Sequence, residues 1–365
     1  MHSLITWILL TTFFICTHAD GNSNVPLIIA HRGASGKYPS HTKIAYEEGA
    51  LYADFIECDL ALTKDLILIC LHDSWLSKTT NISDVFDRNR KNTRNWNGSV
   101  KNDYFSVDFT LEELKSVGKN QERSYRDQIF NGQEITTFGE YLDIALKFGK
   151  GIYPETKNPD DFNRWLVEEA MVEITFEDIL MLELENHAFS KSGLICYFQS
   201  FSIESITFLS EVNTYDPNLS KFVYLSSSPP SDLDLTKLIN ARVLGLGLKK
   251  LVFVEEDSQT NHIKNLHPER IQKYKNLGFT DIHVYTLRNE NEYLLFEFEQ
   301  DFSLEIDFWL ENFPEVDGYF TDFPKSFKNV LENRNCSGGV GPSGSTSYQP
   351  FKGLIALISV ILFII

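Results

Sequence analysis

The feature that most constrains the fold is a regular alternation of short β-type runs and amphipathic helical stretches between residues 26 and 321. Such alternation is typical of parallel strands joined by helical crossovers. The predicted strands cover residues 26–31, 54–60, 66–72, 151–157, 194–201, 221–225, 242–248, 281–287 and 317–321. A closed barrel of this class has eight strands. We therefore expect one of the two weaker candidates, 221–225 or 242–248, to be an accessory segment.

An open, doubly wound sheet is the competing architecture. That fold carries a glycine-rich phosphate loop after its first strand, and Gly245-Leu-Gly247 does not have this form. The sequence therefore predicts an α/β protein whose residues 25–330 form one (β/α)8 TIM barrel, with a loop lobe inserted after strand 3.

The inserted lobe is predicted at residues 74–150, because this stretch is long for a barrel loop. We expect it to lie over the barrel mouth and to influence substrate choice. Thr110 and Thr137 are each followed three residues later by a Glu, which is the pattern of a capping box at a helix start. Gly149 is placed to end the second of these helices.

The charge balance excludes some classes of partner. The 365 residues include 33 Lys and Arg against 51 Asp and Glu, a formal net charge of −18. Such an excess argues against nucleic-acid binding and against electrostatic docking on anionic lipid. With 42% hydrophobic residues, the chain has the composition of a folded, enzyme-sized domain.

Both ends of the chain resemble targeting segments. Residues 1–19 have the apolar run and small residues of a cleaved signal peptide. Residues 336–365 pass from small and polar residues to the apolar run 354–365, the layout of a glycosylphosphatidylinositol (GPI) attachment signal. A membrane helix is the alternative at each end, but both runs are shorter than the ~20 residues of a span. We expect a GPI-anchored protein of the secretory pathway at the cell surface.

A secretory route gives meaning to two further features. N-glycans are expected at three Asn-X-Ser triplets, which begin at Asn81, Asn97 and Asn218. Four cysteines remain after removal of the signal segment: Cys58, Cys70, Cys196 and Cys336. Disulfides and buried free thiols are both compatible with this number.

Charged side chains occur where the first four predicted strands end. These residues are His31, Arg32, Glu57, Asp59, His72, Glu155 and Lys157. Side chains two residues apart on a strand share a face, so Glu57 and Asp59 point the same way, as do Glu155 and Lys157. Because the carboxyl ends of barrel strands gather at one mouth, we expect all seven side chains to meet there.

This combination of groups indicates phosphoester chemistry. The carboxylates of Glu57, Asp59 and Glu155 would repel one another without a cation, and an oxygen-only ligand set suits Mg²⁺ or Ca²⁺. His31 and His72 fit an acid–base pair, and the planar guanidinium of Arg32 suits a phosphate. Taken singly, each feature is typical of a solvated or hydrogen-bonded rim; their occurrence on four successive strands carries the inference.

Several motifs resemble the glycerophosphodiester phosphodiesterase family, in its bacterial periplasmic and plant secreted branch. They are IIAHRGASG at 28–36, PSHT at 39–42, FIECD at 55–59, LTKD at 62–65, LHD at 71–73, IYPETK at 152–157, FQSF at 198–201, VYTLRN at 284–289 and DGYFTDFP at 317–324. The resemblance covers residues 25–330. It implies a (β/α) barrel that hydrolyses glycerophosphodiesters, such as glycerophosphocholine, to sn-glycerol 3-phosphate and an alcohol.

The resemblance also implies roles for the residues at the strand ends. The divalent-metal ligands would be Glu57, Asp59 and Glu155; the acid–base pair His31 and His72; and the phosphate-facing residues Arg32 and Lys157. One position departs from the family pattern: Ser40 stands where the family usually has Glu, and it lacks the carboxylate's charge and second oxygen. This departure leaves open that the enzyme is slower, or that it accepts substrates with other head groups.

Three alternative functions remain at this level. The same barrel and His pair occur in phospholipase D-like and lyase enzymes that act on lipids such as lysophospholipids. A non-catalytic cell-surface barrel is supported by Ser40 alone. A sugar-acting barrel would use two carboxylates without the Arg and His.

Overall fold

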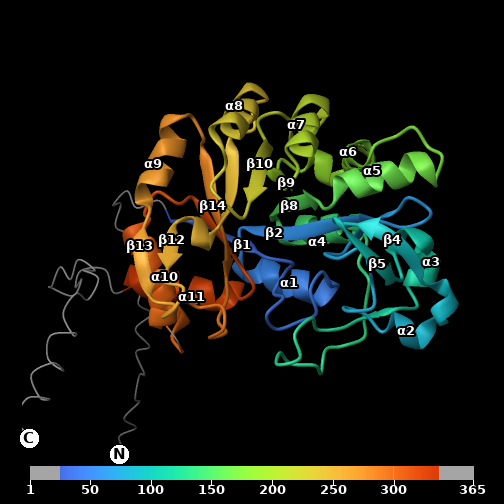
Figure 1. Cartoon of the computed structure of the whole chain (residues 1–365), viewed down its shortest axis with the longest axis horizontal. Helices are drawn as coiled ribbons and strands as arrows, with labels where there is room; N and C mark the ends of the chain where they lie inside the picture. The colour runs from blue at the N-terminus through green and yellow to red at the C-terminus, as the bar shows by residue number, and fades with distance from the viewer. Residues whose placement is uncertain (1–24, 299, 337–365) are drawn as a thin grey trace, which may run out of the picture.

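Eight parallel strands form a closed barrel surrounded by helices (Figure 1). This computed structural model describes residues 25–298 and 300–336. The barrel strands are β1 (Leu27–Ala30), β2 (Phe55–Leu62), β8 (Gly151–Thr156), β9 (Cys196–Ser200), β10 (Ser220–Ser226), β11 (Gly245–Lys249), β14 (Asp281–Leu287) and β15 (Gly318–Thr321). Neighbours pair in this order, and β15 pairs with β1 to close the ring. The predicted (β/α)8 barrel is confirmed.

The accessory strand is β3 (Leu68–Cys70), and the prediction that it would be 221–225 or 242–248 is wrong. β10 and β11, which include most of these two candidates, are both barrel strands. β3 instead pairs antiparallel with the end of β2, with Leu60 opposite Cys70. The returning arm of a hairpin has the same apolar character as a barrel strand, and that pattern does not show which strands pair.

The helices that surround the barrel start and stop at local sequence signals. They are α1 (Lys43–Tyr52), α4 (Phe138–Phe148), α5 (Pro159–Glu168), α6 (Phe176–Asn186), α7 (Ile203–Val212), α8 (Asp232–Asn240), α9 (Pro268–Asn276), α10 (Phe302–Asn312) and α11 (Pro324–Cys336). The capping boxes at Thr110 and Thr137 are both formed. Gly149 ends α4 with a φ of 62°, in the left-handed region that favours glycine.

The segment between β3 and α4 adds small elements beside the barrel. They are α2 (Ile82–Val85), β4 (Asn92–Trp96), β5 (Ser99–Asp103), α3 (Leu111–Leu114), β6 (Gly118–Lys119) and β7 (Gln133–Glu134). Trp96 packs on Phe162 of α5, with ring centroids 5.1 Å apart, and the β4–β5 hairpin lies beside α5 in Figure 1. The predicted lobe of 74–150 also includes α4, but α4 packs on α1 in the helical ring. The added segment therefore runs from residue 71 to residue 137.

The remaining short elements lie in loops. They are the hairpin strands β12 (Val254–Glu256) and β13 (Ile263–Leu266) and the 3₁₀ turns η1 (Arg88–Arg90), η2 (Ser106–Asp108), η3 (Ala188–Lys191), η4 (Lys250–Val252) and η5 (Phe296–Phe298). Within residues 25–298 and 300–336, no helix has both the length and the hydropathy of a membrane span. The predicted signal peptide (1–19) and nearly all of the predicted tail (336–365) lie outside the described residues.

A plug of apolar side chains fills the barrel below its mouth. The plug consists of Ile29, Phe55, Tyr153, Tyr197, Val223, Leu225 and Phe320. A larger apolar layer lies between the strands and the surrounding helices. Because β2 is buried along its whole length, its alternate residues Phe55, Glu57 and Asp59 line the barrel interior. The plug thus forms the floor on which the charged residues stand.

Candidate active site

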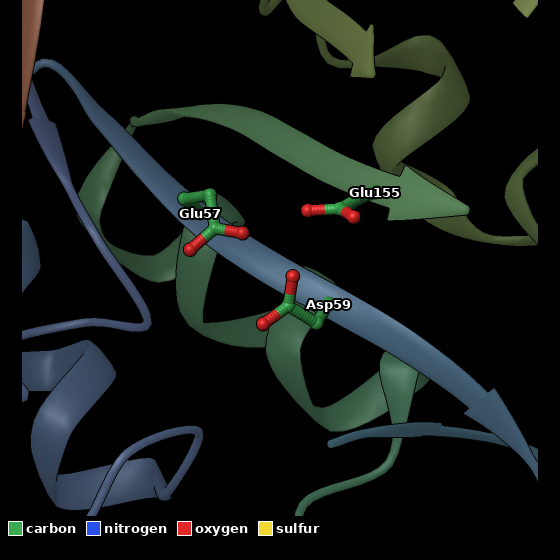
Figure 2. Close-up of side chains that lie close together, drawn as sticks. All are labelled: Glu57, Asp59 and Glu155. Atoms are coloured by element: carbon green, nitrogen blue, oxygen red, sulfur yellow. The ribbon is translucent and has the colours of Figure 1, made fainter. Parts of the chain in front are cut away.

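Three carboxylates face one another at the mouth of the barrel (Figure 2). Asp59 of β2 is the register partner of Glu155 of β8, and Glu57 lies two residues earlier on the same face of β2. One oxygen from each carboxylate lies within 4.8 Å of the other two. All three residues are at most 4% exposed. The register of two neighbouring strands therefore creates the cluster.

The protonation behaviour of this cluster fits a divalent cation. Burial, followed by repulsion from Asp59, raises the pKa of Glu57 well above its ordinary value. Burial and the Asp59 charge also outweigh the Lys157 ammonium at Glu155 and raise its pKa to about 8. Burial opposes ionisation of Asp59 as well, but Lys157, His72 and Arg32 hold its pKa well below the usual range. The nearby cations thus stabilise the ionised form of Asp59 only. Ionising Glu57 and Glu155 as well requires further positive charge.

Two cationic side chains flank Asp59. The Nζ of Lys157 lies 3.1 Å from Glu155 Oε1 and 3.7 Å from Asp59 Oδ1. On the other side, Arg32 Nε lies 3.3 Å from Asp59 Oδ2. Both side chains line the cavity that contains the carboxylates, so both are available to an anionic group entering it.

A tight turn places Arg32 beside the carboxylates. Arg32 has a φ of 60°, and its backbone N–H donates to Glu57 Oε2 at 2.7 Å. The next residue, Gly33, has a φ of 78°, and a Cβ there would lie 2.5 Å from the carbonyl carbon of Ala45 in α1. Only glycine fits this contact, which explains the Arg-Gly sequence directly after β1.

His31 forms a dyad with Asp322, which follows β15. Its Nδ1 lies 2.6 Å from Asp322 Oδ1, while Asp322 Oδ2 accepts from Arg126 Nη2 at 2.6 Å and from Arg288 Nε at 2.7 Å. Burial and the Arg32 charge lower the pKa of His31 to about 3 despite the Asp322 carboxylate. The imidazole is therefore neutral, and with Nδ1 donating to Asp322 its Nε2 is a proton acceptor.

His72 has a similar arrangement at the same cavity. Its Nδ1 lies 2.8 Å from Asp73 Oδ1, and its side chain is 28% exposed against 13% for His31. Burial and the Arg32 charge lower its pKa. The β2–β3 hairpin returns the chain to the level of Asp59, whose carbonyl accepts from Leu71 N at 2.8 Å. His72 thus reaches the mouth although β3 is not a barrel strand.

All seven side chains predicted to meet at the strand ends line one cavity of about 640 Å³. The volume is in the range of small-molecule sites. Its far wall includes Lys249 at the end of β11 and Tyr285 of β14. The segments that follow β9, β11 and β14 add Phe201, Glu256 and Tyr293 to this wall. The site therefore combines three carboxylates that could hold a hard cation, two oriented imidazoles and two cationic side chains with space for a small anionic substrate.

A sequence model of the glycerophosphoryl diester phosphodiesterase family matches residues 31–326. The chain belongs to this family. It is a phosphodiesterase of the hydrolase class, and the resemblance seen in the motifs is confirmed.

Individual relatives agree with membership of the phosphodiesterase family. Glycerophosphodiester phosphodiesterase GDPD6 of Arabidopsis thaliana is 35% identical, over 84% of this chain and 86% of its own length. The Bacillus subtilis glycerophosphodiester phosphodiesterase is 29% identical, over 83% and 86%. An Oleispira antarctica phosphodiesterase solved with the product sn-glycerol 3-phosphate shares the fold, with a TM-score of 0.57 and 19% identity, over 84% of this chain and 97% of that one.

Three further polar residues of this phosphodiesterase site were not singled out from the sequence. Asp322 follows the last barrel strand, so the strand-end rule used for the first four strands would have found it. Gln199 of β9 donates to Glu57 Oε1 at 3.1 Å. His41 Nε2 lies 2.9 Å from Asp59 Oδ2 and is fully buried; it lies in a loop, where no periodic pattern indicates a role.

Proposed function

We propose that the chain hydrolyses glycerophosphodiesters such as glycerophosphocholine to sn-glycerol 3-phosphate and an alcohol. One observation carries the proposal: a cluster of three carboxylates, two imidazoles with carboxylates on Nδ1, and the cations Arg32 and Lys157 line a single cavity. Family membership supports the reaction class. The product named for the Oleispira enzyme supports the glycerol phosphate half of the substrate.

The carboxylates of Glu57, Asp59 and Glu155 would hold one divalent cation, Ca²⁺ or Mg²⁺. Their buried, oxygen-only set and the raised pKa values of Glu57 and Glu155 support this. When bound, such an ion supplies Lewis-acid polarisation of the phosphate oxygens.

The other side chains would bind the phosphate and move protons. Arg32 and Lys157 bind the phosphate oxygens and stabilise the charge that builds on them. Of His31 and His72, one takes the proton of the nucleophile, which is water or the neighbouring glycerol hydroxyl, and the other donates a proton to the leaving oxygen. Asp322 and Asp73 orient these imidazoles by accepting from Nδ1.

A diester panel tests the proposal. Purified protein is assayed with glycerophosphocholine, glycerophosphoinositol and lysophosphatidylcholine, each with Ca²⁺, Mg²⁺ or a chelator, and release of sn-glycerol 3-phosphate is measured. We expect release from at least one glycerophosphodiester that the chelator abolishes and that the His31→Ala variant lacks. Preferential cleavage of lysophosphatidylcholine, or no glycerol phosphate under any condition, would refute the proposal.

We also propose that the mature protein is secreted, glycosylated and held at the cell surface by a GPI anchor. The terminal segments 1–19 and 336–365 are the basis for the route and the anchor. Exposed side chains at Asn97 and Asn218 support glycans there. Asn81 is half-buried, and its Oδ1 accepts from Gly118 N. Release from cells by a phosphoinositide-specific phospholipase C, and a mass shift on deglycosylation, are the expected results; absence of both would contradict the proposal.

A further inference from the structure

The segment added between β3 and α4 brings a carboxylate to the active-site arginine. Glu122 lies 3.2 and 3.4 Å from Arg32 Nη1 through its two oxygens. Its Oε1 also accepts from Ser40 Oγ, and its side chain is only 13% exposed. Arg32 is thus held at two places, through Nε at Asp59 and through Nη1 at Glu122.

Neighbouring residues fix the position of Glu122. Gln121 Nε2 donates to the carbonyls of Ser35 and Tyr38 at 3.2 and 3.1 Å, and Gln121 Oε1 accepts from Glu122 N at 2.9 Å. Arg126 Nη1 donates to the Ser35 carbonyl at 2.9 Å, and its Nη2 donates to Asp322. These bonds join residues 121–126 to the loop after β1, the same loop that carries Arg32.

Glu122 is also the main counter-charge for a buried lysine. Lys119 is 0% exposed, and within the described residues its Nζ has no hydrogen-bond partner. Burial lowers the pKa of Lys119, and Glu122 is the largest opposing influence. Burial disfavours the ionised form of Glu122, but Arg32, His72 and Lys119 hold its pKa well below the usual range. Glu122 is therefore an anion surrounded by cations, and its Oε2 also lies 3.7 Å from Arg123 Nη1.

The Glu122 carboxylate lies next to the side chain of Ser40. In a glutamate the carboxylate oxygens stand two bonds beyond the γ atom, and Glu122 Oε1 lies at hydrogen-bond distance from the γ oxygen of Ser40. A glutamate at position 40, which is the usual family residue there, would therefore direct its carboxylate to the region that the Glu122 carboxylate occupies.

We propose that Glu122 is a positioning residue for Arg32. Glu122, in the added segment, supplies the carboxylate that a glutamate at position 40 would supply and that Ser40 lacks. Without it, Asp59 alone would hold the guanidinium and would draw it toward the carboxylate cluster and away from an incoming phosphate. The inference rests on the proposed phosphodiesterase function, in which Arg32 binds the phosphate. It also means that the site keeps the negative charge that Ser40 lacks, because Glu122 carries this charge at another position in the sequence.

Four variants test this role: Glu122→Gln, Glu122→Ser, Ser40→Glu, and the double variant Ser40→Glu/Glu122→Ser. KM for glycerophosphocholine and the dissociation constant of sn-glycerol 3-phosphate are measured together with Tm. Loss of a charge-assisted contact predicts a rise of about tenfold in both constants for Glu122→Gln. Ser40→Glu alone places two carboxylates together and is also impaired. We expect the double variant to recover to within about threefold of the wild type.

The readouts separate positioning from folding and from the proposed function itself. A purely structural role would lower Tm and the active fraction without moving KM or product affinity. Glu211→Gln, an exposed change on α7, removes the same charge elsewhere and is expected to behave as wild type. If the wild type is active but Glu122→Gln keeps KM and product affinity within twofold, or the double variant is no better than Glu122→Ser, the positioning role is refuted. If the wild type hydrolyses no glycerophosphodiester, the proposed function fails instead.

Discussion

A buried histidine in the barrel floor makes a quantitative prediction about acid stability. His283 of β14 is 0% exposed, and its Nδ1 lies 2.8 Å from Tyr153 Oη. Within the described residues its Nε2 has no hydrogen-bond partner. Protonation would therefore bury both a charge and an unpaired N–H. Burial lowers the pKa of His283 to about 4, against opposing influences from Asp281 and Asp317.

The direction and size of the effect on stability follow from the linkage between proton binding and folding. An unfolded chain takes up a proton at this histidine below pH ~6.5, whereas the folded chain does so only near pH 4. The unfolded state binds more protons in this window, so the free energy of unfolding falls as the pH falls through it. The effect is ~1.4 kcal/mol per pH unit. Because of His283, the free energy of unfolding should therefore fall by about 2 kcal/mol between pH 7 and pH 5, and by about 3 kcal/mol by pH 4.

The test is urea unfolding of the wild type and His283→Gln at pH 7 and pH 5, in the presence of a chelator. Glutamine does not titrate and can still pair with Tyr153 Oη. We expect the wild type to lose about 2 kcal/mol more than the variant on going to pH 5. His262→Gln, at a histidine whose side chain is 56% exposed, serves as the control. Equal losses in wild type and His283→Gln would refute the argument.

Three further predictions concern the site itself. His31→Ala or His72→Ala should lower kcat by ~10²–10⁴ with an unchanged circular dichroism spectrum; near-normal turnover of either variant contradicts its role in proton transfer. Glu57→Gln should raise the divalent-ion concentration needed for half-maximal activity, and an unchanged metal titration contradicts the ligand assignment. Gly33→Ala should lower the free energy of unfolding by at least ~1 kcal/mol, because its Cβ would meet the α1 backbone and its φ is 78°; a Tm equal to that of the wild type rules this out.

Local patterns were sufficient for the barrel and for the set of residues at its mouth. The period of two on a strand puts Glu57 and Asp59 on one face, and parallel strands end at the same edge. These two facts need no knowledge of which strand lies beside which. The prediction of barrel strands was wrong at β3, because the returning strand of a hairpin and a barrel strand have the same sequence pattern and differ only in the strands that they pair with.

Contacts between distant segments could not be predicted in this way. His31 and Asp322 are 291 residues apart in the sequence, and they meet only because β15 pairs with β1 and closes the ring. Glu122 lies in a segment with no periodic pattern, so nothing in the sequence indicates that it faces Arg32. Residues at the ends of regular elements are thus within reach of sequence reasoning, whereas their partners from loops require the structure.

Burial, together with nearby cations, explains why His31 can remain a neutral imidazole beside a carboxylate. A carboxylate alone would favour the protonated ring and raise its pKa. Here the second oxygen of Asp322 is hydrogen-bonded to both Arg126 and Arg288, and Arg32 is the next residue along the chain. Burial is the largest cause of the lowered pKa of His31, and the charges of Arg32 and Arg288 add to it. Asp322 can still accept from Nδ1. The dyad therefore orients the ring without charging it.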